Sequence, residues 1–232
     1  MVRANRTQVS ASAPGRSLAA YHRKRDLRQS GEPGGRTRVG RRQVPIFIVQ
    51  KHDATRLHYD FRLEAEGVLK SWAVPNGLPT RVGEKALAIE VEDHPLDYGG
   101  FEGTIPAGNY GAGTVMLWDR GVYVLEGDYA SAYRKGHIHV ALAGEKLRGE
   151  WTLVRMRPRP GEKKPSWLVL KNHASGKLPE VKISRTARDL SVLSGRSLAE
   201  IAAGVKVRRP ARKAKAAAPK KSSRARRRLA DR

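Results

Sequence analysis

The chain has 232 residues, 39% of them apolar, which is enough for one sizeable β-rich domain or two small ones. It contains no cysteine, so disulfide frameworks, thiolate zinc sites and cysteine nucleophiles are excluded, and any metal ion must be held by His, Asp or Glu. No apolar run approaches the roughly 20 residues of a membrane-spanning helix, and the N-terminus lacks the apolar core of a signal peptide. We therefore expect a cytoplasmic protein with no membrane partner.

The net charge of +24 is concentrated at the two ends of the chain. Residues 1–44 carry a net charge of +9 and residues 203–232 a net charge of +12, so the body between them carries only +3. Basic runs diluted with Ala, Ser and Pro cannot bury enough apolar surface to offset chain entropy. We predict disordered tails at residues 1–17 and 203–232. The basic C-terminal tail favours nucleoid association through counterion release, the alternative being a tail that only solubilises.

Residues 18–35 form a basic segment that ends in proline and glycine. The apolar residues from Leu18 to Tyr21 predict a short helix that ends before Pro33. Composition alone indicates that the segment is a linker. A second short helix is predicted at Ser197–Val205, close to the basic tail.

From Pro45 onward, short apolar runs of ordinary strand length are separated by turn residues. They lie at residues 45–50, 57–63, 68–75, 87–93, 113–119, 121–127, 137–144, 150–156 and 166–171. Asp119, Arg120 and Gly121 predict a tight hairpin between the fifth and sixth runs. The fold class expected is mainly β, a closed or nearly closed antiparallel β-barrel with short flanking helices, or otherwise a sandwich.

The run at 57–63 carries an unusual polar face. Its apolar residues alternate with His58, Asp60 and Arg62, which are expected to face inward together. His58 and Asp60 have Cα atoms about 6.6 Å apart on such a strand, close enough to share one cation. With His52 as a third ligand, they form a 2-His-1-carboxylate set that suits Mn, Fe or Zn. Arg62 beside the ligands favours an anionic substrate such as phosphate.

A second group of polar residues lies in Glu90–Gly113. His94 is a candidate general acid or base, and Tyr98 a candidate hydrogen-bond donor to an oxyanion, although a structural turn explains both residues equally well. The glycines of this stretch indicate turns rather than a phosphate-binding loop. His137 and His139 are expected on a solvated strand face without an accompanying carboxylate.

Several motifs of the chain resemble those of the 3'-phosphoesterase module of bacterial DNA ligase D, an end-joining repair enzyme. They are HDATRLHYDFRLE, LKSWAVPNGLP, EDHPLDYGGFEGTIPAGNYGAG and LRGEWTLVRM followed by WLVLK. YHRKRDLRQSGEP is similar to the lead-in of that module, and SVLSGRSLAEI resembles the segment that follows it. The resemblance covers about residues 18–202 and leaves no room for ligase or polymerase modules, so it predicts a stand-alone member.

The resemblance implies an Mn²⁺-dependent enzyme, with Co²⁺ or Zn²⁺ as alternatives, that removes a 3'-terminal ribonucleoside and then the remaining 3'-phosphate. The 3'-hydroxyl left behind would serve double-strand break repair by end joining. The residues that the resemblance implies as metal ligands are His52, His58 and Asp60. Those that would contact the scissile phosphate are Arg62, His94 and Tyr98, and those that would complete the catalytic site are Arg25, Asp26 and Glu32.

The implied domain spans residues 18–202 and replaces the linker interpretation. It comprises a lead-in at 18–44 that packs on the barrel, a barrel at 45–175 and a C-terminal extension at 176–202. The implied partners are DNA primer-template 3' ends with ribonucleotide or phosphate termini, and a separate end-joining ligase, polymerase or end-binding protein. We expect a monomer.

Two positions depart from the family pattern. Asn76 stands where the family often has a lysine, and Ala86, with Lys85 beside it, stands where a basic residue is common. Two other functional classes stay open: a 2-His-1-carboxylate Fe(II) oxygenase, and a non-catalytic nucleic-acid binder that acts through its basic tails.

Overall fold

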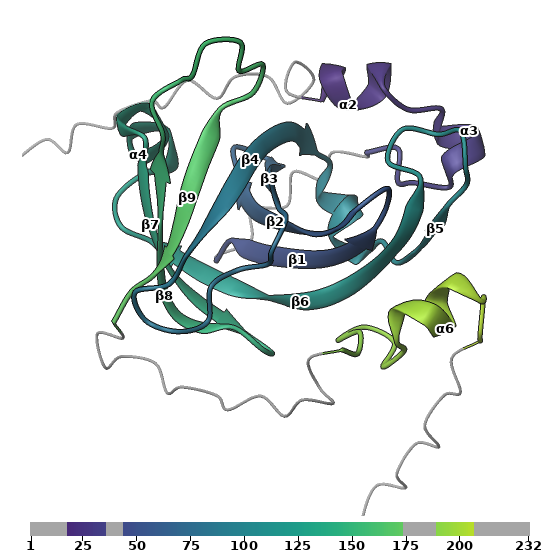
Figure 1. Cartoon of the computed structure of the whole chain (residues 1–232). Coiled ribbons are helices and arrows are strands. Elements are labelled where there is room, and N and C mark those ends of the chain that lie inside the picture. Colours follow the sequence, from purple (N-terminus) through teal and green to yellow (C-terminus); the bar gives the residue numbers. More distant parts are fainter. Residues whose placement is uncertain (1–17, 36–43, 174–188, 207–232) are drawn as a thin grey trace, which may run out of the picture.

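The computed structural model describes residues 18–35, 44–173 and 189–206. The tail predicted at 1–17 lies outside this part of the chain, and so does the tail predicted at 203–232 except for residues 203–206, which follow helix α6 (Leu198–Ala202). The structure is mainly β (Figure 1). Its strands are β1 (Ile46–Asp53), β2 (Leu57–Ala65), β3 (Val68–Val74), β4 (Lys85–His94), β5 (Gly103–Ile105), β6 (Gly113–Leu125), β7 (His137–Gly144), β8 (Arg148–Arg155) and β9 (Ser166–Lys171).

Eight of these strands close into an antiparallel barrel. The hydrogen-bonded order is β1-β2-β3-β4-β9-β8-β7-β6, and β6 returns to pair with β1. The short strand β5 adds to the free part of β6, outside the closed ring. Because closure pairs both edges of every barrel strand over at least part of its length, this arrangement confirms the predicted barrel and excludes the sandwich.

The barrel interior is filled by apolar side chains from all eight strands. Phe61 and Leu63 of β2 belong to this cluster, together with three fully buried tryptophans, Trp72, Trp151 and Trp167. Since side chains alternate along a strand, the polar residues of β2 lie on the outer face of the barrel. The prediction that they face inward was therefore wrong, because the interior volume is taken up by the large apolar residues.

A second apolar cluster covers that outer face. On one side it contains Tyr21 of helix α2 (Ala19–Arg23) and Leu18, the residue just before that helix. These pack with Tyr98 of the 3-10 helix η1 (Leu96–Gly100) and with Ile48 of β1. Tyr21 is fully buried and donates its hydroxyl hydrogen to the carbonyl oxygen of Pro33. Residues 18–35 of the lead-in thus pack over the outside of the barrel instead of extending as a linker.

The predicted hairpin at Asp119–Gly121 was wrong, because β6 runs unbroken through these residues. Opposite Val49 and Gln50 of β1 the register shifts by one residue, with Trp118 as the extra residue of β6, and the two strands stay paired on both sides of it. The Asp119 carboxylate accepts hydrogen bonds from the backbone N–H groups of four residues, Arg120, Glu145, Lys146 and Leu147. The polar residue inside this strand therefore organises the neighbouring β7–β8 turn and does not form a turn of its own.

Three further helices flank the barrel: α3 (Leu27–Ser30), α4 (Tyr129–Lys135) and α6 (Leu198–Ala202). The short helix expected at 197–205 is present as α6, and a capping box between Ser197 and Glu200 begins it. Helix α4 was not predicted, although Asp128 caps its N-terminus and Gly136 ends it in a left-handed conformation. Figure 1 shows α6 beside β6, on the side away from α4.

Candidate metal centre and phosphate site

The hairpin of β1 and β2 sets two histidines side by side. His52 and His58 are direct register partners, with ring centroids 4.8 Å apart, and Asp60 follows two residues along β2 on the same face. Asp60 Oδ2 lies 3.7 Å from His52 Nδ1, and Asp60 Oδ1 lies 3.8 Å from His58 Nε2. One ligand atom from each residue falls within 4.8 Å of the others. The three side chains therefore converge on a space the size of one cation.

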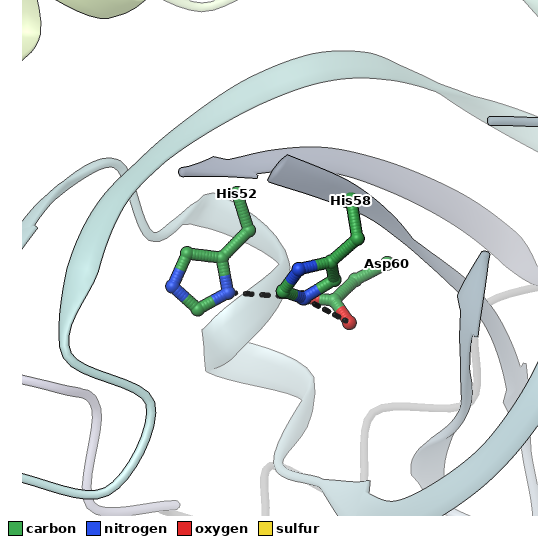
Figure 2. Close-up of side chains that lie close together, drawn as sticks. All are labelled: His52, His58 and Asp60. Carbon is green, nitrogen blue, oxygen red and sulfur yellow. Dashed lines mark ion pairs between the residues drawn. The ribbon is translucent and has the colours of Figure 1, made fainter. Parts of the chain in front are cut away.

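Backbone carbonyls fix the orientation of both imidazole rings. His52 Nε2–H donates to the carbonyl oxygen of Gly111 at 3.0 Å, and His58 Nδ1–H donates to that of Arg56 at 2.9 Å. Because each ring donates its one N–H hydrogen to a carbonyl, its other nitrogen is left as an acceptor. In both histidines that nitrogen faces Asp60, and Figure 2 marks the two contacts with dashed lines. This outer-shell arrangement is typical of histidines that ligate metals.

Arg62 is buried beside the three candidate metal ligands, with 2% of its surface exposed. Its guanidinium donates to Gln50 Oε1 at 2.9 Å, to Ser71 Oγ at 2.8 Å and to Asp60 Oδ2 at 3.1 Å. It also lies 4.9 Å from the centroid of the Tyr98 ring. These partners fix the position of the positively charged Arg62 guanidinium, so an anion can bind to it without a rearrangement of the side chain.

Asp60 is ionised in this environment. Burial alone would raise the pKa of its carboxyl, but the charge of the Arg62 guanidinium, with smaller contributions from the neighbouring His52 and His58, holds that pKa well below its usual value. The carboxylate therefore offers a negative charge to a metal ion at all physiological pH values.

A network of charges from the lead-in segment closes the other side of the site. Arg25 Nε donates to Glu32 Oε1 at 3.0 Å, and Arg25 Nη1 donates to Glu92 Oε1 at 3.0 Å. Lys24 bonds the second oxygen of Glu92 at 2.8 Å. The other Glu32 oxygen, Oε2, is buried and has no hydrogen-bond partner among the described residues. Because Glu32 lines the same cavity as the histidines, this oxygen is an acceptor at the site whose hydrogen-bonding capacity is not used.

His94 and Tyr98 complete the site wall. His94 Nδ1–H donates to the carbonyl oxygen of Glu92 at 2.9 Å, so its Nε2 accepts from Arg25 Nη2 at 3.1 Å. Burial, reinforced by the charges of Arg62 and Arg25, lowers the pKa of His94 well below its ordinary value, so the ring is neutral. Burial likewise raises the pKa of Tyr98, whose phenol stays protonated and able to donate.

These residues line one cavity of about 180 Å³. Its charged lining comprises two arginines and three carboxylates, with Lys24 bound to one of the carboxylates. A divalent cation at the histidines would leave the site with two net positive charges, which balance a phosphate dianion. The electrostatics therefore suit a metal ion and a phosphate together.

Of the residues expected at the site, all but one line this cavity. Asp26 is the exception, because its carboxylate is exposed and caps helix α3 by accepting from Arg28 N. Asn76 and Ala86 do not line the cavity either. Asn76 is exposed, and Ala86 packs against the barrel core.

Sequence reasoning missed Gln50, Ser71, Glu92 and Tyr110. The first two bond Arg62, Glu92 bonds Arg25, and Tyr110 lines the cavity. The usable signal was positional, since Gln50 precedes His52 by two residues and Glu92 precedes His94 by two. Gln50 and His52 therefore share a strand face, and so would Glu92 and His94 in a regular strand.

His139 corrects another prediction. Its ring lies between two carboxylates, 3.1 Å from Glu126 and 3.3 Å from Glu150. The expectation that no carboxylate accompanies this histidine was wrong, because both partners come from parts of the chain that sequence spacing does not connect. His137 is exposed, as expected.

Comparison with known proteins gives a consistent result. Residues 50–155 match the family model described as the DNA Ligase D 3'-phosphoesterase domain. The multifunctional non-homologous end joining protein LigD of Pseudomonas aeruginosa is 53% identical over 155 residues, 66% of this chain and 18% of the relative. The corresponding LigD of Mycobacterium tuberculosis is 43% identical over 149 residues, 64% of this chain and 20% of the relative.

The chain spans about a fifth of the length of these curated relatives. Within the described ranges, no helix is both long and apolar enough to cross a bilayer. The matched region contains the three clustered ligands, Arg62, His94 and Tyr98. Through residues 50–155, this chain belongs to the family of DNA ligase D 3'-phosphoesterase domains.

Proposed function

We propose that the chain is a metal-dependent phosphoesterase that heals DNA 3' ends, removing a terminal ribonucleoside and then the 3'-phosphate to leave a 3'-hydroxyl. The observation that carries this proposal is one cavity that combines a 2-His-1-carboxylate cluster with two buried arginines. The family match supports the same class of reaction.

The residues present fit a divalent metal ion. His52, His58 and Asp60 would hold it, because two oriented imidazole nitrogens and one ionised carboxylate already face a common point. Nitrogen and oxygen donors of this kind suit Mn²⁺, with Co²⁺ or Zn²⁺ as alternatives. When bound, such an ion supplies Lewis-acid stabilisation of charge on the phosphoryl oxygens.

The other side chains bind and orient the phosphate. Arg62 and Arg25 offer guanidinium donors to its non-bridging oxygens, and Tyr98 offers its phenol hydrogen. His94 is neutral in the free protein, and a phosphate dianion beside it raises its pKa, so that Nε2 gains a proton for the leaving group. Its bond to the Glu92 carbonyl leaves Nε2 facing Arg25, so the proton enters at Nε2 once the phosphate draws the Arg25 guanidinium away from the ring.

The two other classes receive less support. An Fe(II) oxygenase shares the ligand set, but it does not need two arginines buried at the metal cluster. A non-catalytic binder needs neither an ionised carboxylate nor a neutral buried histidine in a cavity. The relatives are named as end joining proteins, so we also propose that DNA 3' ends in end joining are the substrates of this chain.

The proposal is tested with labelled primer-templates that end in one ribonucleotide or in a 3'-phosphate. The wild-type protein should shorten and dephosphorylate these ends with Mn²⁺ and should be inactive with EDTA. His58→Ala should lose both activities by at least about 1000-fold, because the metal then lacks one of three ligands.

His173→Ala is the matched control, because His173 is an exposed histidine just after β9, outside the cavity. It should turn over both primers like the wild type. Retained Mn²⁺-stimulated turnover in His58→Ala would refute the metal assignment, and no wild-type turnover on either primer would refute the proposed reaction.

A further inference from the structure

Tyr110 is the most exposed aromatic residue in the described part of the chain. Its exposed fraction is 43%, whereas every other described tyrosine, tryptophan and phenylalanine is buried or half-buried. It nevertheless lines the cavity that holds the metal cluster and the arginines. A large aromatic ring exposed at the mouth of this cavity offers an apolar face to a ligand that enters it.

The loop that carries Tyr110 is fixed in place. Residues 106–112 fold through two turn hydrogen bonds, Asn109 N–H to the Pro106 carbonyl and Ala112 N–H to the Asn109 carbonyl. The carbonyl oxygen of Gly111, the residue after Tyr110, accepts the hydrogen bond from the candidate metal ligand His52. At Gly113, a Cβ would lie 2.2 Å from the carbonyl oxygen of Asp53, so the loop end presses directly on β1. The backbone at Tyr110 is therefore held in place relative to the candidate metal centre.

Two cations are bound to the same ring. Lys24 Nζ lies 4.8 Å from the ring centroid and 3.3 Å from the Tyr110 hydroxyl, and the Arg25 guanidinium lies 5.1 Å from the centroid. Arg25 also reaches His94 inside the cavity. The mouth thus places an exposed aromatic surface directly beside positive charge, the combination that nucleic-acid-binding proteins use for a base and its phosphate.

We propose that Tyr110 is the stacking platform for the base of the 3'-terminal nucleotide, placing the phosphate of that nucleotide at the arginines and the metal ligands. This inference rests on the proposed function and adds to it a residue that selects nucleotide ends over simple phosphate esters. Stacking does not depend on base identity, so the site accepts any terminal base.

Binding without turnover tests the platform, because EDTA removes the metal and leaves the aromatic contact. Fluorescence anisotropy of a labelled primer-template with a 3'-phosphate should show similar affinities for wild type, Tyr110→Phe and Tyr110→Trp. Tyr110→Leu should bind about 5- to 150-fold more weakly, the range that loss of one stacked base corresponds to. Tyr110→Phe separates the ring from its hydroxyl, which accepts from Lys24.

The same variants are measured with a primer whose terminal nucleotide lacks its base. If Tyr110 stacks on that base, the wild type should bind the abasic primer more weakly than the complete primer, by the same factor that Tyr110→Leu loses on the complete primer. On the abasic primer, Tyr110→Leu and the wild type should then bind with equal affinity. Leu87→Ala is the control, because Leu87 has the same exposed fraction, 43%, and does not line the cavity. It should bind both primers like the wild type.

Equal losses for Tyr110→Leu on the two primers, or no loss on either, would overturn the stacking proposal. Circular dichroism melting curves that match the wild type show that each variant is folded. The proposed function has a separate readout. If it is wrong, the wild type shows no turnover with Mn²⁺, and this result does not depend on the relative primer affinities of the Tyr110 variants.

Discussion

Single residues at this site are held by partners that fix their protonation. His94 is 3% exposed, gives its Nδ1 hydrogen to a backbone carbonyl and accepts from Arg25 at Nε2. A proton added to this ring would be buried next to two guanidinium groups, which is why its pKa is lowered. The site therefore keeps this histidine uncharged in the free protein.

This lowered pKa predicts a pH dependence of stability in the metal-free protein. The unfolded chain binds a proton at this imidazole as the pH falls through about 6.5, while native His94 stays neutral until its lower pKa is reached. Between these two values the unfolded state binds more protons, so the free energy of unfolding decreases as the pH falls.

Urea unfolding in EDTA at about pH 7.5 and about pH 5.5 measures this effect. His94→Asn should lose less stability over this interval than the wild type does, because the titrating group is gone. His173→Asn, which removes an exposed histidine, should follow the wild type. An unchanged pH dependence in His94→Asn would show that the native ring takes up its proton at an ordinary pH.

The residue types at the metal cluster were readable from sequence, while their partners were not. Alternation in β2 and a short turn are enough to bring His52, His58 and Asp60 together, because a hairpin pairs neighbouring segments. Glu92 contacts Arg25 across 67 positions of the chain. Sequence patterns relate residues only a few positions apart, so they do not reveal this pair. The pairing of Arg25 with Glu92 follows from the packing of the lead-in on the barrel.

Among the elements, β6 departs most from its sequence pattern. Turn-forming residues at 119–121 favour a hairpin, yet pairing with β1 on one side and β7 on the other keeps the strand continuous. Gly121 explains part of this outcome, since a Cβ there would lie 2.1 Å from the carbonyl oxygen of Ala143. Glycine permits close approach of two strands at this point, a use that its turn propensity conceals.

Gly121→Ala should therefore lower the free energy of unfolding by about 1–3 kcal/mol, because the methyl group forces β6 and β7 apart. Urea unfolding at neutral pH measures the change. Gly100→Ala is the control, because a Cβ at Gly100 has no atom within 4 Å, and its effect should stay within about 0.5 kcal/mol. Equal stability of Gly121→Ala and the wild type would mean that the strands separate at little cost.

Element type was easier to predict than element boundaries. Eight of the nine strands coincide with apolar runs, since barrel strands bury one face and so alternate. The ninth, β5, has three residues and is too short to show a period. Helix α4 carried its own cap residues, Asp128 and Gly136, but lay between two stronger strand patterns. Short elements are thus harder to predict, because packing against the rest of the fold stabilises them and their sequences are too short to show a clear pattern.

The whole molecule places its site outside the barrel rather than within it. The interior serves stability alone, filled by three tryptophans and the apolar faces of eight strands. The outer face of β1 and β2 becomes a cavity only because the lead-in, η1 and the loop after β5 cover it. Segments far apart in sequence therefore share one site, with the barrel as a rigid support.

The central claim is that His52, His58 and Asp60 form a divalent metal centre, and titration of Mn²⁺ into the metal-free protein by calorimetry tests it most directly. Wild type and His173→Ala should bind Mn²⁺ with equal affinity at one site. His58→Ala should bind it more weakly by more than about 100-fold, the upper end of what loss of an outer-shell partner costs. Equal Mn²⁺ affinity and stoichiometry in wild type and His58→Ala would contradict the assignment.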